Sequence, residues 1–148
     1  RKKGQPEVSH AVAAQICRAL EWLNAEGLDK EGIHRQPGSH EAVLALVEQI
    51  ASGKTVQWRE VQPHDASGAI RQTLGSRFAP LFPSEVYTDV LRAGTAAQFS
   101  ALVSQLQPVH AALLRAILWH VTLVVAASSV TKMDEKACSR TILLNLAR

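Results

Sequence analysis

Apolar residues recur along most of this chain at the three- and four-residue spacing that places them on one face of a helix. The first stripe covers residues 12–23 and follows Ser9, a residue suited to cap a helix. A second stripe covers residues 43–50 and follows Ser39 in the same way. We expect Gly27 to end the first helix in the left-handed conformation.

The middle of the chain continues the helical pattern, with breaks at glycine and proline. A third helix is expected to begin at His64 and to weaken at Gly75. Ser84 suits the cap of a short fourth helix. The apolar positions within residues 99–106 predict a fifth helix, which Pro108 would stop.

The last third of the chain holds its most apolar segment. The spacing predicts a helix from Val109 to about Ala127 that is apolar on nearly every side. Its uncharged run, residues 116–130, is shorter than the roughly 18 to 20 residues of a membrane span, so we expect a buried central helix and no membrane insertion. A last helix is expected to start near Asp134 and run to the end. The fold class is therefore all-α.

Composition and charge fit a single packed helical domain. The chain has 148 residues, of which 47% are hydrophobic and only 5% aromatic. The formal charge of +3 equals the charge of Arg1, Lys2 and Lys3, so the rest of the chain is neutral. Because the basic excess is confined to these residues, the chain is a poor candidate for nucleic-acid binding. We expect a flexible basic leader over residues 1–5 and the domain over residues 6–148.

The cysteines and histidines give no sign of a disulfide or a metal site. Cys17 and Cys138 both lie among apolar residues inside helical patterns, which predicts free thiols in a reducing compartment. The six histidines lack cysteine or carboxylate neighbours at ligand spacing, so we expect no metal. The reducing compartment that free thiols indicate is typical of a cytoplasmic location.

One short loop concentrates unusual residues around a single arginine. The segment GIHRQPGS, residues 32–39, joins the first two predicted helices. Its two glycines allow backbone angles closed to other residues, and Pro37 has a fixed φ. We expect a stiff loop that presents Arg35 outward. An arginine in a turn is ordinarily only a solvated surface charge.

The loop and its surroundings resemble the Rho GTPase-activating protein (RhoGAP) domain family, whose signature reads close to GIFRVSGS. His34 replaces the usual aromatic residue, and the same register holds from Pro6 to Arg148. The resemblance implies a helical domain of the RhoGAP type. It also implies that Arg35 is an arginine finger, a charge inserted in trans beside the phosphates of a GTPase-bound nucleotide. His34, beside it, would touch the GTPase.

A second family block, close to HxVASLLKxxLRELPxPLxP, appears here as HDASGAIRQTLGSRFAPLFP, residues 64–83. The lysine that contacts the GTPase in the family falls on Arg71, which keeps the charge but not the compact ammonium. The alternative is that Arg71 is a solvated helix charge. The arginine that helps hold the finger loop falls on Gly75. Arg77, two residues on, would emerge on another face of a helix.

A third block, close to NKMTxxNLAxxFGPxLLR, appears as TKMDEKACSRTILLNLAR, residues 131–148. Lys132 and Met133 match, and Asn145 matches an asparagine that often follows the family's proline. The resemblance implies that Lys132 and Asn145 help bind the GTPase. The alternative for Lys132 and Met133 is a helix cap and a core residue. The family's GTPase-contacting asparagine falls on Ala137.

Two functions remain open from these residues. The first is an activator of a GTP-bound small GTPase of the Rho, Rac or Cdc42 type, without a cofactor of its own, because Mg²⁺ and the hydrolysing site belong to the GTPase. Since Gly75 and Ala137 replace two supports, the expected activity is weak or specialised. The second is an interaction module that binds a GTPase or another partner without activating it. Membrane recruitment would be left to flanking domains.

Overall fold

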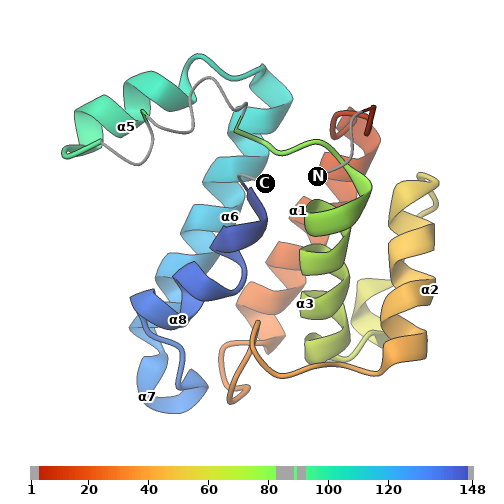
Figure 1. Ribbon diagram of the computed structural model, residues 1–148. Coiled ribbons are helices and arrows are strands. Elements are labelled where there is room, and N and C mark those ends of the chain that lie inside the picture. Colours follow the sequence, from red (N-terminus) through yellow and green to blue (C-terminus); the bar gives the residue numbers. More distant parts are fainter. Residues whose placement is uncertain (1–3, 83–88, 90–92, 147–148) are drawn as a thin grey trace.

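The computed structural model describes residues 4–82, 89 and 93–146 of the chain, and all of its described elements are helical (Figure 1). The helix predicted after Ser84 lies largely outside these residues. Of the leader predicted over residues 1–5, only Gly4 and Gln5 are described, and the Gln5 side chain donates a hydrogen bond to the Ser76 carbonyl oxygen at 2.5 Å. In chain order the elements are α1 (His10–Glu26), α2 (His40–Ala51), the 3-10 turn η1 (Trp58–Glu60), α3 (Pro63–Gln72), the π-helical segment η2 (Thr73–Arg77), α5 (Ala96–Val103), α6 (Pro108–Ala126), α7 (Ser128–Thr131), α8 (Glu135–Arg140) and the 3-10 turn η3 (Leu143–Leu146).

The first helix begins where the sequence predicts and ends by a different mechanism. The Val12 amide donates to the Ser9 hydroxyl at 3.2 Å, and the whole predicted apolar stripe is buried. Gly27 ends α1, but its φ of −107° is not left-handed, so that expectation is wrong. A Cβ atom at Gly27 would lie 2.9 Å from the Leu23 carbonyl oxygen. Glycine is therefore needed here for space and not for its backbone freedom.

The predicted central helix is confirmed as the core of the domain. In α6 the residues Leu113, Ile117 and Val124 are 0% exposed and Val121 is 9% exposed. The helix is long and apolar enough to cross a membrane by those criteria alone. Its inner face is instead covered by other helices of the domain, most extensively by α1.

The helices form two groups around α1, as Figure 1 shows. One face of α1 packs against α6, which α8 covers in turn, and another packs against α3 and α2. The segment between α1 and α2, residues 27–39, crosses the end of this packing on its way to α2. Helix α5 extends away from the rest, and Val103 is its only buried residue. The loop that carries Arg35 therefore lies where both groups of helices meet.

Two helix ends differ from the sequence prediction. Helix α5 stops at Val103 instead of continuing to Pro108, and a capping box of Thr95 and Gln98 that the pattern analysis missed begins it. The last helix stops at Arg140 and does not reach the end of the chain. The Thr141 hydroxyl donates to the Ala137 carbonyl oxygen at 2.9 Å, and its φ and ψ of −115° and −94° turn the chain into η3. Side-chain bonds of this kind compete with the helical backbone.

The two cysteines are free, as predicted. Cys138 is buried at 0% exposure in α8 and Cys17 is half-buried in α1. Burial is the main cause that raises the pKa of both thiols above their ordinary value, which keeps them protonated at neutral pH.

The position of α6 predicts a large cost for truncating its centre. Replacing Ile117 by alanine should lower the free energy of unfolding by about 2 to 5 kcal/mol, because the cavity lies among helices that cannot close on it. Arg115→Ala, on the exposed face of the same helix, is the control and should stay within about 0.5 kcal/mol of the unchanged domain. Urea denaturation of both variants measures the difference. Equal stabilities would contradict the central position of α6.

Candidate functional site

The loop of residues 32–39 is a compact turn with two left-handed residues. Gly32 and His34 both have a φ of 70°. The amides of Arg35 and Gln36 donate to the same Gly32 carbonyl oxygen at 2.8 and 2.7 Å. Glycine suits position 32, because a side chain there would be strained and would collide with the Gln36 side chain. At His34 the surrounding structure must hold the strained backbone in place.

Contacts at both ends attach this turn to the helices. The Gly32 amide donates to the Thr131 carbonyl oxygen at the end of α7, at 2.6 Å. The Ser39 amide donates to the Asp65 carboxylate in the first turn of α3, at 2.7 Å. Gly38 lies so close to Asp65 that any Cβ atom would collide with the backbone of α3. The loop is thus fastened to α7 on one side and to α3 on the other.

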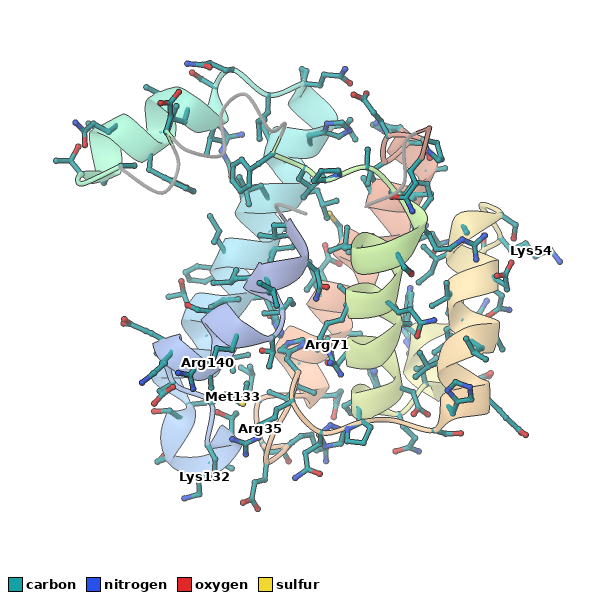
Figure 2. The ribbon with its side chains drawn as sticks, viewed as in Figure 1. Arg35, Lys54, Arg71, Lys132, Met133 and Arg140 are labelled. Atoms are coloured by element: carbon teal, nitrogen blue, oxygen red, sulfur yellow. The ribbon has the colours of Figure 1, made fainter. Side chains whose placement is uncertain are left out.

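Arg35 lies on the outer side of this turn, where the sequence analysis expects it. Its side chain is exposed, and within the described part of the chain its guanidinium has no hydrogen-bond or ion-pair partner. Figure 2 shows it projecting from the loop below α8 and α3. A guanidinium carries a permanent charge and a planar set of donors. The arrangement leaves that whole donor set available to another molecule.

His34 does not contact the surface, so the expectation that it touches a GTPase is not supported. The residue is 0% exposed. Its Nδ1 lies 2.7 Å from the Ser67 hydroxyl of α3, and its Nε2 lies 2.6 Å from Nε2 of His120 in α6. The two rings meet edge to face, with centroids 4.8 Å apart. The turn therefore sends consecutive side chains in opposite directions, His34 inward and Arg35 outward.

Arg71 and Asn145 share a surface pocket with the residues that follow Arg35. The pocket has a volume of about 370 Å³ and is lined by loop, α2, α3 and η3 residues. Arg71 is half-buried, and its Nε donates to the Ser67 hydroxyl at 3.4 Å. Burial lowers the pKa of the Arg71 guanidinium, which nevertheless stays charged at neutral pH. The lining residues are Pro37, Gly38, His40, Val43, Gly68, Arg71, Gln72 and Asn145.

Lys132 and Met133 have the structural positions that were kept as the alternative. Lys132 ends α7 with a left-handed φ of 59°, and its exposed Nζ donates to the Ser129 carbonyl oxygen at 2.9 Å. Met133 is 0% exposed. At the last residue of α7, the Thr131 hydroxyl donates to the Val124 carbonyl oxygen at 3.1 Å and accepts from the Met133 amide at 3.2 Å. Thr131 thus fixes the carbonyl group that receives the Gly32 amide.

The space beside Gly75 is occupied from the C-terminal part of the chain. Gly75 lies in the π-helical segment η2, and a Cβ atom there would lie 2.5 Å from Oδ1 of Asn145. The side-chain Nδ2 of Asn145 donates to the Thr141 carbonyl oxygen at 3.1 Å. Arg77 pairs with Glu48 of α2, so it is directed away from this space. The arginine that the family carries at position 75 therefore has no direct substitute in Arg77.

Sequence reasoning missed several residues that build this site. Asp65 and Thr131 anchor the loop through contacts that no local pattern reveals. Arg140 is an exposed arginine in the last turn of α8. In Figure 2 it lies in the same part of the view as Arg35 and Arg71, whereas Lys54 lies on the opposite side of the molecule. The only signal for Arg140 was its place inside the third sequence block, residues 131–148.

Comparison with solved structures gives the same fold. Human Rho GTPase activating protein 15 superposes with a TM-score of 0.77 at 21% identity, over 90% of this chain and 68% of that one. The BH domain from Graf, the GTPase regulator associated with focal adhesion kinase, also gives 0.77, at 14% identity over 93% of this chain and 80% of that one. At these identities the similarity establishes the all-α architecture.

Sequence comparison supplies the family. Rho GTPase-activating protein 68F of Drosophila melanogaster is 35% identical over 82 residues, which are 55% of this chain and 17% of that protein. Rho GTPase-activating protein gacY of Dictyostelium discoideum is 25% identical over 153 aligned residues, 97% of this chain and 21% of that protein. The chain thus spans about a fifth of the length of these relatives. The profile of the RhoGAP domain matches residues 14–148, and the chain belongs to the RhoGAP domain family.

Proposed function

We propose that this domain accelerates GTP hydrolysis on a GTP-bound Rho-family small GTPase by inserting Arg35 beside the transferred phosphate. The observation that carries the proposal is the exposed guanidinium of Arg35, which has no hydrogen-bond or ion-pair partner among the described residues, on a loop fastened to α3 and α7. A finger must be free to meet its target and yet be held in one position. Such an arginine contributes roughly 10³ to 10⁵ to turnover in this class of reaction.

The domain would act as a regulator, with the chemistry on its partner. The GTPase holds the nucleotide, Mg²⁺ and the residue that orients the attacking water. This chain contributes charge stabilisation and binding surface. Its site of action would be cytoplasmic, where the switch regions of the GTPase are accessible.

Docking would use the surface on either side of Arg35. The Arg71 guanidinium and the Asn145 side chain line one pocket with the loop, and Lys132 ends the helix to which the loop is fastened. Arg71, Lys132 and Asn145 would bind the GTPase while Arg35 reaches the nucleotide. Arg140 extends the row of cations toward α8.

The second candidate function, a binding module without activity, is favoured by a specific observation. Gly75 and Ala137 stand where the family carries an arginine and an asparagine, and the space beside Gly75 is filled by Asn145. A finger loop with fewer supports is less well positioned, and a misplacement of about 1 Å can cost on the order of 100-fold in rate. The two candidates differ in catalysis and share the docking surface.

The first test removes the finger. Arg35→Ala should reduce the stimulation of single-turnover GTP hydrolysis by up to about 10³-fold, because the transition-state charge loses its partner. Arg35→Lys should restore little, since one ammonium does not reproduce the planar fork. The melting temperature of both variants should match that of the unchanged domain, because the exposed side chain has no hydrogen bond or ion pair among the described residues.

A panel of GTP-loaded Rho-family GTPases is the substrate in that assay. Arg59→Ala, an exposed arginine in η1, is the control and should keep full stimulation. If Arg35→Ala stimulates as well as the unchanged domain, Arg35 is not the finger.

The second test addresses docking. Arg71→Glu should weaken binding to the GTP-loaded GTPase by about 30-fold, which corresponds to about 2 kcal/mol for reversing a desolvated interface charge. Arg59→Glu changes the charge by the same amount outside the pocket and should leave affinity within a few-fold. Isothermal titration at fixed ionic strength measures both. An unchanged affinity of Arg71→Glu would remove Arg71 from the interface.

The third test separates the activator from the binding module. The double substitution Gly75→Arg with Ala137→Asn should raise stimulation above that of the unchanged domain by restoring two supports. The side chain introduced at position 75 must displace Oδ1 of Asn145, which requires the Asn145 side chain to rotate. If neither protein stimulates any GTPase that the unchanged domain binds, the binding module is the function.

A further inference from the structure

A continuous line of polar side chains crosses the interior of the domain beneath Arg35. It runs from Asn24 in α1 through His120 in α6 to His34 in the loop. From there it continues through Ser67 to Arg71, both in α3. The three contacts around the histidines have lengths of 2.6, 2.6 and 2.7 Å. Polar groups this deeply buried are stable only when each one has a partner.

One arrangement of protons gives a partner to every group along this line. His120 Nδ1 faces Oδ1 of the Asn24 side chain, an acceptor, so in this arrangement Nδ1 carries the proton and donates. A neutral His120 then accepts at Nε2, which requires His34 to donate from its own Nε2. His34 Nδ1 is left to accept from the Ser67 hydroxyl, whose oxygen receives the Arg71 Nε hydrogen. In this arrangement every ring nitrogen has a partner and both rings are neutral.

This line bears directly on the finger because His34 is the residue before Arg35. His34 has a left-handed backbone, which a non-glycine residue keeps only if its surroundings compensate. The compensation comes from its ring contacts, one to α6 and one to α3. Fixing the ring of His34 fixes the peptide that carries Arg35. The family's usual aromatic residue at this position has no comparable polar anchor.

We propose that His120, oriented by Asn24, is a positioning residue for Arg35 that acts through the hydrogen bond to His34. The inference rests on the proposed function for its effect on catalysis. Its effect on the loop itself can be measured without any GTPase. His120 does not touch the partner, being 0% exposed.

The surroundings of the pair favour the neutral rings that this arrangement needs. The charged and titratable groups acting on His34 are His120 from α6 and Arg71 and His64 from α3, while α1 contributes the uncharged Asn24. Burial, followed by repulsion from the positive charges that His120, Arg71 and His64 can carry, keeps the pKa of His34 well below its usual range. Burial also lowers the pKa of His120 to about 4. At neutral pH both rings are therefore uncharged.

The decisive variant removes the acceptor. His120→Ala leaves the His34 Nε2 hydrogen buried without a partner, so the loop should loosen. The control is His110→Ala, since His110 is a second buried histidine of α6 whose Nε2 bonds to the Val8 carbonyl oxygen, away from the loop. We expect hydrogen exchange of the Arg35 and Gln36 amides to accelerate at least tenfold in His120→Ala only. Equal exchange in the two variants would overturn the inference.

Activity gives the second measurement. Stimulation of GTP hydrolysis at saturating domain should fall about 10- to 100-fold in His120→Ala, while the dissociation constant for the GTP-loaded GTPase changes less than about threefold. His110→Ala should change neither. A loss of affinity as large as the loss of rate would contradict a positioning role. If the unchanged domain stimulates no GTPase, the proposed function fails, and amide exchange still decides the role of His120.

A paired substitution tests whether the polar contact is what matters. His34→Phe with His120→Leu replaces both partners of the ring contact by apolar groups, so neither Nε2 atom is orphaned, while Asn24 and Ser67 each lose a ring partner. This double variant should recover most of the loop protection and stimulation that His120→Ala loses. Recovery no better than that of His120→Ala would show that the ring contact was not responsible.

Ring ¹⁵N shifts of the unchanged domain at pH 7 should show the proton on Nε2 of His34 and on Nδ1 of His120.

The same pair predicts an acid response. In the unfolded chain both histidines titrate near the ordinary value of about 6.5, whereas in the folded domain their pKa values are lower. The unfolded state therefore binds more protons below that pH, so stability is full above about 6.5 and falls as the pH drops toward 4. The unfolding equilibrium constant should rise by up to about tenfold per pH unit for each histidine. The paired apolar variant should respond less, and equal slopes in the two proteins would contradict the buried neutral pair.

Discussion

The site depends on the opposite directions of two neighbouring side chains. His34 enters the core and Arg35 leaves it, and the left-handed backbone at His34 makes this reversal possible within one short turn. Without the inward anchor, Arg35 would be an arginine in a solvent-exposed loop, which can sample many positions. With the His34 anchor in place, the backbone of Arg35 is held by the contacts of the His34 ring with α6 and α3. The core therefore determines how well the exposed charge is placed.

The two ends of the loop are also held by helices of the domain. Gly32 is fastened to the end of α7, which continues from α6, and Ser39 is fastened to the first turn of α3. Because α1 lies between α6 and α3, the loop joins the two groups of helices at their shared end. A change in how α6 packs on α1 would consequently move the anchor of His34. The position of Arg35 therefore depends on how the helices of the domain pack.

The sequence predicted the features that depend on local pattern. The stripes of α1 and α6 and the caps at Ser9 and Ser39 are all present, because spacing and capping chemistry are local. The anchors at Asp65 and Thr131 were not predictable, since each joins segments far apart in the chain. The resemblance did contain one unused signal. An aromatic residue at position 34 in the family indicates burial, and His34 follows that pattern instead of docking.

The packing around Gly75 suggests how the missing supports relate to the buried histidine pair. In the family an arginine at this position helps hold the finger loop, and here the Asn145 side chain lies in its place and bonds to the Thr141 carbonyl oxygen. No arginine side chain therefore supports the loop from η2. On this side the loop residues Pro37 and Gly38 line the same pocket as Asn145. The polar line through His34 and His120 approaches the loop from within and ends at Arg71, which lines the same pocket. With no arginine side chain at position 75, the buried contact of His34 with His120 is the support that would hold the finger from within, and it is the one that acid would remove.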